Sequence, residues 1–530
     1  MRARATIHPR LLAAALCTVL AVGARAQERP SEDELFGPPP AAAVEEKPAP
    51  SPASGAGEHG QTEAELFGAQ KPPAQPRAPG GALISPERED WLKVGGLLQL
   101  QAQASAYQDT RPHDWLLSSP DLLDVYLDSR PNDRVRGFVL GRLNYDPTVR
   151  STGGSTLGST GTSTIGFGTS SSQNPGGVLD QLWVNFDLDH QAFVTAGRQH
   201  VKWGVGKFWN PTDYLHPVKR DPLATFDVRT GTTMVKVHVP WEKRGWNFYA
   251  VALLEDASGD QSRTASRLGR VGGGGRAELV LGGAELGLDG LAQDGHRPRW
   301  GVDLSAGVGP FDLYGEAALR TDTDGPLWRR SSPPPPVPYS ELLNWVRDDR
   351  RGVIPQIVAG GTWSVKYSDE DSLTVGAEYF YNGAGYDRPD VYPYLLTGAP
   401  VFPPPTVNGQ PAFVQQDPTA FRPFYLGKHY AAVNLYLPKP GSWNDTTIVA
   451  TVLGNLSDKS YVARLDSSVL ALTYLTVETF VAVHFGHMGG EFRLALPADV
   501  AAQASAESGG STFPAGAPIV DVGIALRVSL

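Results

Sequence analysis

The stretch 197–231 holds the sequence's densest group of side chains that could bind a charged or ring-shaped solute. It reads GRQHVKWGVGKFWNPTDYLHPVKRDPLATFDVRTG. Lysine and arginine heads attract carboxylates and phosphates, and aromatic faces stack on sugar rings. Residues 210–213, Asn-Pro-Thr-Asp, predict a turn, because Asn and Asp side chains bond nearby backbone and Pro fixes φ. The candidate contacts for a solute are Arg198, His200, Lys202, Trp203, Lys207, Trp209, Asn210, Asp213 and Arg220.

Patterns typical of an enzyme or a metal centre are missing from the sequence. There is no G-x-S-x-G, no H-E-x-x-H and no pair of cysteines with metal-binding spacing. His484 and His487 lie three residues apart near the end of an expected strand, where that spacing points the two rings to opposite faces. We therefore expect no catalytic residue, no metal and no cofactor.

From Trp91 onward the chain consists of short runs in which apolar and polar residues alternate. In residues 98–106 the apolar parity is Leu-Leu-Ala-Ala-Ala and the other parity is Gln-Gln-Gln-Ser. Similar alternation recurs in residues 135–145, 182–188, 235–239, 300–308, 311–319, 373–381 and 477–485. A period of two residues is that of a β-strand, and helical periodicity is nearly absent. The sequence predicts an all-β domain.

The connections between these runs alternate in length. Short turns are expected at 129–133, 187–191, 240–245, 282–284, 308–310 and 368–372, and long connections at 151–177, 199–230, 256–272, 322–352 and 383–427. Soluble sandwiches rarely separate lengths in this way, whereas outer-membrane barrels have short periplasmic turns and long extracellular loops. We predict a closed antiparallel transmembrane β-barrel of roughly 16 to 18 strands.

The last residues, IVDVGIALRVSL, form one more amphipathic run that ends at the final residue. A barrel must pair its last strand with its first so that no edge is left. The final Leu530 stands where Phe or Trp is usual in the assembly signal of such barrels. Lipid on the apolar side and water on the polar side explain the alternation; a half-buried strand of a soluble sheet is the alternative.

Charged residues of the polar parity would face the barrel interior, and their signs are close to balanced. We therefore expect most of them to pair across strands rather than to form a ring of one sign. They are Arg136, Arg142, Lys236, His238, Arg276, Lys366 and Arg527 against Glu278, Asp303, Asp312, Glu316, Glu378, Glu478 and Asp521.

Residues 1–26 have the three parts of a secretory signal peptide. Three arginines precede an apolar run of about a dozen residues, and Ala24-Arg25-Ala26 is a small-x-small cleavage site. The only cysteine, Cys17, lies inside the apolar run, so it would leave with the signal; a lipid anchor there is the alternative. The net charge of −10 argues against nucleic-acid binding, which requires positive charge.

Residues 27–90 are rich in Pro, Ala, Glu and Gly, and predict a disordered arm in the periplasm. One phrase occurs twice in it, as SEDELFG at 31–37 and TEAELFG at 62–68. Each has Ser or Thr three residues before Glu, the pattern of a helix capping box. Leu35, Phe36, Leu66 and Phe67 are therefore candidates for docking a periplasmic protein partner; chance similarity in a biased segment is the alternative.

Residues 179–215 resemble a strand-turn-strand-loop unit of large Gram-negative outer-membrane porin-like β-barrels, which include the alginate-export and phosphate-selective porins. The shared pattern is a G-R-Q strand, then W-G, then an N-P-x-D turn. The matching residues here are Gly197, Arg198, Gln199, Trp203, Gly204, Asn210, Pro211 and Asp213. The resemblance covers a small part of the chain. It implies an outer-membrane channel and does not imply which solute passes.

Three functional hypotheses follow for the barrel of residues 91–530. The first is a porin-like channel for small polar or anionic solutes or an exported polysaccharide, with residues 197–231 folded inward as a constriction; a purely structural inward fold is the alternative for that loop. The second is a non-conducting scaffold that recruits periplasmic partners through the repeated phrase. The third is a barrel enzyme acting on lipid or peptide. The oligomeric state stays open.

Overall fold

The computed structural model describes residues 91–148, 174–216, 218–224, 227–255, 268–294, 296–321, 323, 327–330, 345–348, 352–368, 371–396, 406–407, 410–411, 421–496 and 516–529. The signal peptide predicted at 1–26, the arm predicted at 27–90 and the docking candidates Leu35, Phe36, Leu66 and Phe67 lie outside the described residues. Within the described part no helix is long and apolar enough to cross a membrane.

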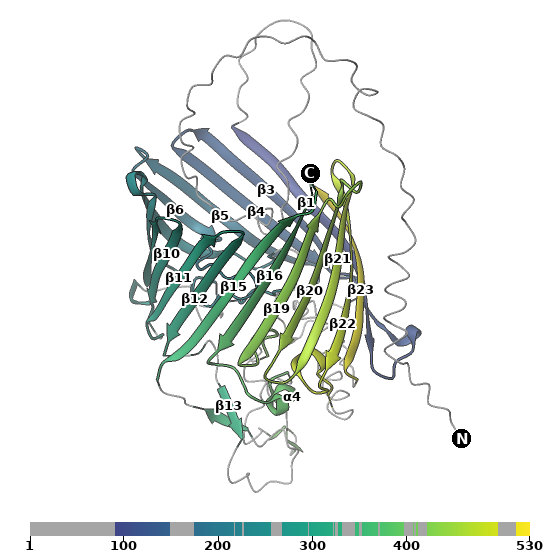
Figure 1. Cartoon of the computed structure of the whole chain (residues 1–530). Coiled ribbons are helices and arrows are strands. Elements are labelled where there is room, and N and C mark those ends of the chain that lie inside the picture. The colour runs from purple at the N-terminus through teal and green to yellow at the C-terminus, as the bar shows by residue number, and fades with distance from the viewer. Residues whose placement is uncertain are drawn as a thin grey trace, which may run out of the picture. The chain divides into compact units, whose positions relative to one another are not determined.

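Eighteen antiparallel strands form a closed barrel (Figure 1). They are β1 (Leu92–Tyr107), β3 (Asp121–Asn132), β4 (Val135–Tyr145), β5 (Gly176–Leu188), β6 (Ala192–Gln199), β7 (Thr232–Trp241), β8 (Trp246–Leu253), β9 (Gly272–Leu281), β10 (Ala284–Ala292), β11 (Arg299–Val308), β12 (Phe311–Arg320), β15 (Ile354–Lys366), β16 (Ser372–Asn382), β19 (His429–Pro438), β20 (Thr446–Asn455), β21 (Ser460–Leu472), β22 (Leu475–Gly486) and β23 (Pro518–Ser529). With β2 (Leu116–Ser118), which pairs with β1, they make the 19-stranded sheet.

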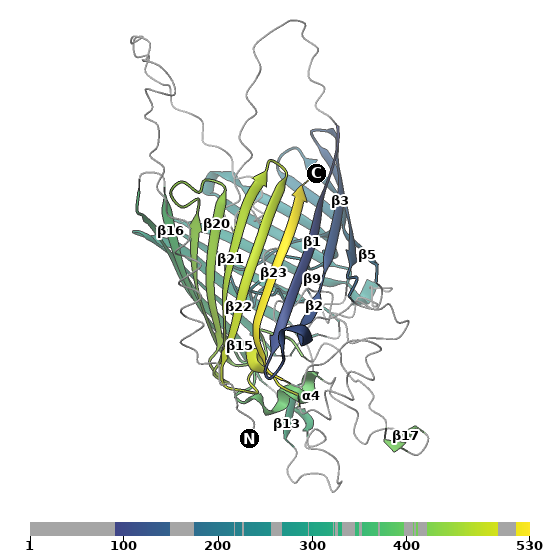
Figure 2. The same ribbon diagram turned by 90° about the vertical axis from the view of Figure 1, so that its right-hand side faces the viewer.

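The first and last strands close the barrel. β1 and β23 pair from Leu97 opposite Ser529 to Tyr107 opposite Pro518, and Figure 2 shows the two strands side by side. The closed antiparallel barrel predicted from the sequence is confirmed, with a strand number at the upper limit of the expected range. Closure pairs both edges of the sheet, which is what a strand-built membrane span requires.

The remaining elements lie in the connections. They are η1 (Pro112–Asp114), η2 (Glu242–Arg244), η3 (Leu268–Arg270), η5 (Pro389–Val391), α4 (Tyr392–Leu396), η6 (Glu491–Arg493) and the strand pairs β13 (Leu327–Arg330) with β14 (Trp345–Asp348) and β17 (Thr406–Val407) with β18 (Gln410–Pro411).

Connection lengths alternate around the barrel as predicted. All six expected short turns connect consecutive strands at one end of the barrel, here called the turn end. The turns between β19 and β20 and between β21 and β22 lie at the same end. The five expected long connections join strands at the opposite end, here called the loop end. Two loop-end connections are also short, residues 293–298 between β10 and β11 and residues 456–459 between β20 and β21.

The outer face of the barrel is apolar and suits a lipid environment. On β1, Leu100 is 45% exposed while its neighbour Gln99, on the inward parity, is 6% exposed. The inward glutamines of β1 form a row, in which Gln99 donates to Gln101 at 3.4 Å and Gln101 donates to Gln103 at 3.3 Å. The parity predicted for this strand is confirmed.

Exposed aromatic side chains gather at the two ends of the outer face. Those near the turn end include Trp91, Trp241, Phe311, Trp363 and Trp443, and those near the loop end include Tyr145, Trp300 and Phe485. Aromatic girdles of this kind mark the two membrane–water interfaces of outer-membrane barrels. On β11 the eight steps from Trp300 to Val308 span about 26 Å at about 3.3 Å per step, which suits an apolar band of about 25 Å.

Part of the barrel interior is apolar, although the sequence pattern predicts a polar lumen. Inward residues of β15, β16, β20 and β21 near the loop end join a buried cluster, among them Val358, Phe380, Leu453 and Val462. The physical reason is that connecting segments enter the barrel and cover these side chains. The same cluster contains Trp209, Leu223, Phe424 and Phe492, all from connections.

A candidate constriction inside the barrel

The connection between β6 and β7, residues 200–231, is fixed to the inner wall by a carboxylate of β12. Glu316 is 3% exposed and accepts hydrogen bonds from four donors of this loop. The amides of Val205 and Gly206 each lie 3.0 Å from Oε2, and the amide and hydroxyl of Thr212 lie 2.7 and 2.8 Å from Oε1. An ionised carboxylate has enough lone pairs for all four donors.

A second carboxylate, Glu378 of β16, holds the next residues of the loop. Its oxygens accept the amides of Lys207 at 2.8 Å, Phe208 at 3.1 Å and Trp209 at 2.8 Å. The hydroxyl of Tyr314 on β12 donates to Glu378 Oε2 at 2.8 Å. Together, the two glutamates bind six backbone amides of one loop. We call this loop, residues 200–231, the latched loop.

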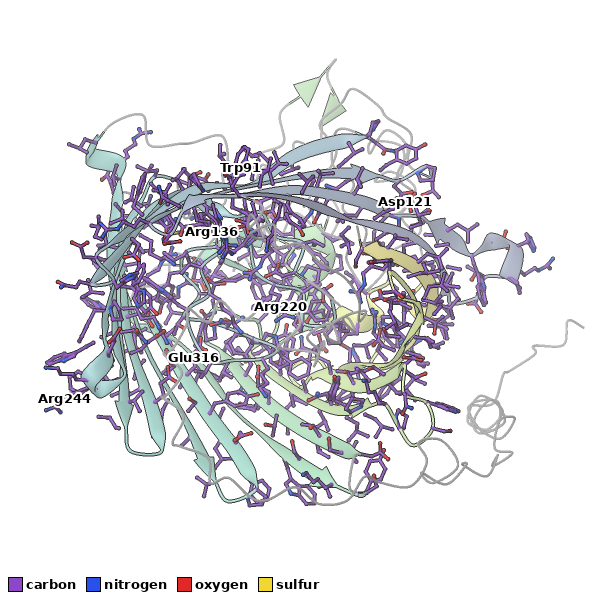
Figure 3. All side chains as sticks on the ribbon, turned by 90° about the horizontal axis from the view of Figure 1, so that it is seen from above. Trp91, Asp121, Arg136, Arg220, Arg244 and Glu316 are labelled. Carbon is purple, nitrogen blue, oxygen red and sulfur yellow. The ribbon has the colours of Figure 1, made fainter. Side chains whose placement is uncertain are left out.

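The latched loop crosses the inside of the barrel, because its anchors are far from its origin. Five strands, β7 to β11, separate β6 from β12, and β16 lies farther still around the barrel. Viewed along the barrel, Arg220 of the loop lies inside the ring of strands, whereas Arg244 of a turn lies at its outer edge (Figure 3).

Gly204 permits the sharp bend at which the loop meets its first anchor. Its φ of +85° is strained for any residue with a side chain. A Cβ at this position would lie 2.3 Å from Asn210 Oδ1, 2.4 Å from Thr212 Oγ1 and 2.5 Å from Glu316 Oε2. The W-G pattern noted in the sequence therefore has a local structural reason.

The two candidate tryptophans of the loop are buried rather than presented to a solute. Trp209 is 0% exposed, stacks on Phe380 with a centroid distance of 5.6 Å and donates Nε1–H to the carbonyl of Phe424 at 3.0 Å. Trp203 is 2% exposed and packs with Tyr214 and Leu215 against inward residues of β7, β8, β10 and β12. Both rings fasten the loop, and neither has a face open to the lumen.

Asp213 and Asn210 form the predicted turn and hold it by buried polar contacts. Asp213 N–H donates to the carbonyl of Asn210 at 3.3 Å. The Asp213 carboxylate accepts from His216 Nδ1 at 2.9 Å and from Arg229 Nη1 at 3.0 Å. Burial alone would raise the pKa of Asp213, but contact with His216 and Arg229 outweighs burial and holds that pKa well below its usual range. Asp213 therefore braces the loop internally.

His200 and Arg198 lie at the root of the loop. His200 Nε2 is 2.9 Å from Asp180 of β5, and its ring stacks on His216 at 5.5 Å. Arg198 is opposite Leu182, an outward residue, so it lies on the outward parity of β6. Its guanidinium donates to Glu255 at 2.9 Å, which sets it apart from the other candidates.

Three candidates, Lys202, Lys207 and Arg220, present cationic groups that have no ion pair within the described residues. Lys207 is exposed, with its ammonium 5.7 Å from the centroid of the Tyr314 ring, and Lys202 and Arg220 are half-buried. The Nε of Arg220 is buried without a hydrogen-bond partner. Burial and the charge of Arg220 lower the pKa of Lys202 to about 8. The latched loop thus brings three cationic side chains to the barrel interior. Acids lie near two of them, Glu316 and Asp213 near Lys202 and Asp312 and Glu378 near Lys207, without forming an ion pair among the described residues.

Sequence reasoning placed Glu316 and Glu378 among ordinary inward charges and missed their role as anchors. One signal was present. Tyr379-Phe380-Tyr381 is apolar on both parities, which a strand facing only water on its inner side would not need. This break in the alternation marks where the loop covers the wall. Within the part of the chain that the structure describes, no group of three or more His, Cys, Asp or Glu could hold a metal ion.

No family model and no curated protein matches this sequence. Solved structures similar to the chain include OccK8 (OprE) of Pseudomonas aeruginosa, at 10% identity over 83% of this chain and 98% of that one, with a TM-score of 0.45. OccK11 (OpdR) of the same organism shares 8% identity over 83% and 96%, with a TM-score of 0.43. A triple mutant of Rhodopseudomonas blastica porin shares 12% over 83% and 100%, with a TM-score of 0.37. Each of these likenesses is one of overall fold.

Proposed function

We propose that the protein is an outer-membrane channel for small polar solutes, with the latched loop as its constriction and a preference for anions. The observation that carries this proposal is the set of three cations on the loop, Lys202, Lys207 and Arg220, which have no ion pair within the described residues. An exported polysaccharide with acidic groups would meet the same charges. The apolar exterior and the aromatic girdles support a place in the membrane.

Many charges on the barrel wall are paired, in contrast to the three cations of the latched loop. Arg142 binds Asp124 at 2.8 Å through two donors, and Arg276 binds Asp303 at 2.6 Å. On the closing strand, Arg527 binds Glu478 at 3.0 Å. Such pairs cancel at a distance, so the proposed anion preference depends on the three loop cations.

Reversal-potential measurements in a KCl gradient across planar bilayers test the proposal. The wild type should prefer chloride, and the triple variant Lys202→Gln, Lys207→Gln and Arg220→Gln should lose that preference. The shift should be larger near 0.1 M salt, where the Debye length is about 10 Å, than at 1 M, where it is about 3 Å.

A matched control removes three positive charges outside the constriction, at Lys243, Arg244 and Lys366, which lie at or beside turn-end connections. This variant should keep the wild-type selectivity. Equal shifts in both triple variants would show that the loop does not select, and absence of conductance in the wild type would exclude a pore.

A second candidate function is a scaffold that recruits a periplasmic partner, and the repeated phrase in residues 31–37 and 62–68 favours it. Changing Leu35, Phe36, Leu66 and Phe67 to Ala should abolish capture of a partner from a periplasmic extract while conductance stays unchanged. Retention of the same partner by the quadruple variant would remove the basis for docking at these residues.

A further inference from the structure

Six consecutive strands, β3 to β8, each place one aromatic or imidazole ring on the inner wall. The rings are Tyr126, Phe138, Trp183, Phe193, His238 and Tyr249. We call this row the ring belt. The ring centroid of Phe138 lies 5.9 Å from that of Tyr126 and 5.5 Å from that of Trp183. Farther along, the His238 centroid lies 5.7 Å from that of Phe193 and 4.6 Å from that of Tyr249. The interplanar angles lie between 12° and 26°.

Strand register shows that these rings face the lumen. Phe138 is directly opposite both Asp128 and Trp183, and Asp128 is the carboxylate that Arg136 binds inside the barrel. Figure 3 shows Arg136 on the inner side of the strands. The Tyr126 ring lies over Gly95 of β1, where a Cβ would be 2.4 Å from the tyrosine oxygen. A glycine at this place lets the ring lie against the wall.

The belt differs from a packed core, since most of its rings keep accessible surface. Tyr126, Phe138, Trp183, Phe193 and Tyr249 are half-buried, and only His238, between Phe193 and Tyr249, is buried. None of the six belongs to the buried clusters that the latched loop forms on the wall. The belt therefore presents ring surface to the lumen, whereas the loop's own tryptophans do not.

Polar groups hold the rings and border them. Trp183 Nε1–H donates to Gln181 Oε1 at 3.0 Å, and the Nε2 of Gln181 makes no hydrogen bond within the described residues. Arg136 lies 5.4 Å from the Trp183 centroid and is bound by Asp128 through contacts of 2.9 and 3.0 Å, so its charge is compensated. Lys236 is the further cation on this face of β7. Flat apolar faces with amides at their edges suit a ligand that has an apolar face and a hydroxyl rim.

We propose that the ring belt is a saccharide-binding track, on which pyranose rings stack as an oligosaccharide passes the constriction. The proposal rests on the proposed channel function and names a solute class for it. Because the contact is between ring faces, neutral saccharides bind as well as acidic ones. An apolar solute would leave the bordering Nε2 of Gln181 without a hydrogen-bond partner, which favours the saccharide.

The test uses the full-length protein in planar bilayers with maltohexaose, a neutral chain of glucose units. The sugar should interrupt the wild-type current in resolved events. The double variant Phe138→Leu and Trp183→Leu keeps apolar volume but removes two flat rings, so the residence time should fall by about threefold to tenfold per ring. Ion selectivity should stay unchanged, because no loop charge is altered. The matched control is Trp363→Leu, on the outer face.

Each outcome bears on the proposal. Shortened events in the double variant alone support the belt, whereas equal residence times in the double variant and the control overturn it. Where no current is interrupted, calorimetric titration of the detergent-solubilised protein with the same sugar measures binding directly. No interruption and no heat in the wild type also overturn the belt. A wild type that fails to conduct but binds the sugar, with binding lost in the double variant, contradicts the channel and supports the belt.

Discussion

The two sides of the barrel interior use the same kinds of residue for opposite purposes. On β12 and β16, carboxylates and aromatic side chains are buried under the latched loop, where Glu316, Glu378 and Phe380 are each 3% exposed or less. On β3 to β5, Tyr126, Phe138 and Trp183 remain half-buried, and the acid Asp128 is bound by an arginine of the adjacent strand. One side holds a loop, and the other is left to face the lumen.

This difference shows that a residue's role in a barrel depends on what covers it. A tryptophan with no accessible face stabilises, as Trp209 does, whereas one with an accessible face, such as Trp183, can contact a solute. Likewise, a glutamate whose oxygens bind backbone amides, such as Glu316, fixes a loop in place. The following predictions test the contrast between the two sides.

The largest effect is expected from the double variant Glu316→Gln and Glu378→Gln. Each substitution replaces a charged acceptor of four hydrogen bonds by a neutral amide, and bonds to charged groups contribute about 1.5–3 kcal/mol each. The loop should detach from the wall, and single-channel conductance should rise and become noisier. Glu478→Gln is the control, since this inward glutamate pairs with Arg527. A conductance equal to that of the control would mean that the carboxylates do not hold the loop.

The next largest effect is expected when the same substitution, tryptophan to alanine, is made on each of the two sides. Trp209→Ala should lower the free energy of unfolding by about 3–5 kcal/mol, because it leaves a cavity beside Phe380 and Tyr430. Trp183→Ala should lower it by roughly half of that or less, since its ring is partly exposed. Urea-induced unfolding in lipid vesicles, followed by gel mobility, measures both. Equal losses would contradict the assignment of one ring to packing and the other to the lumen.

The smallest effect is a pH dependence of selectivity. The pKa of Lys202 is lowered to about 8, so its positive charge is present below pH 8 and is lost as the pH rises through that value. Anion preference should therefore be greater at pH 6.5 than at pH 9.5, by the contribution of one of the three loop cations. Lys202→Arg should remove this dependence, because arginine stays charged throughout. If the arginine variant follows the same pH curve, another group is responsible.

Short-range patterns in the sequence predicted the architecture well. Alternation at 98–106 and 518–529 is a property of neighbouring residues, so it gave the parity of β1 and β23 before any pairing was known. Connection lengths distinguished the two ends, and the many aromatic residues of 197–231 indicated a loop that turns inward. The resemblance to porin-like barrels depended on residues of this same stretch.

The sequence alone therefore predicted a closed β-barrel with an inward basic loop, because parity, turn spacing and composition are local. Only the tertiary structure decided which acids hold the loop. Glu316 and Glu378 lie on the inward parity of their strands just as Glu478 does, and they meet the loop from over 100 residues away in the chain. The ring belt could not be predicted from the sequence either, because strand register brings its rings together. That register shifts at the bulge between Leu140 and Gly141. Register and loop docking are long-range properties, and a period of two residues carries no information about either.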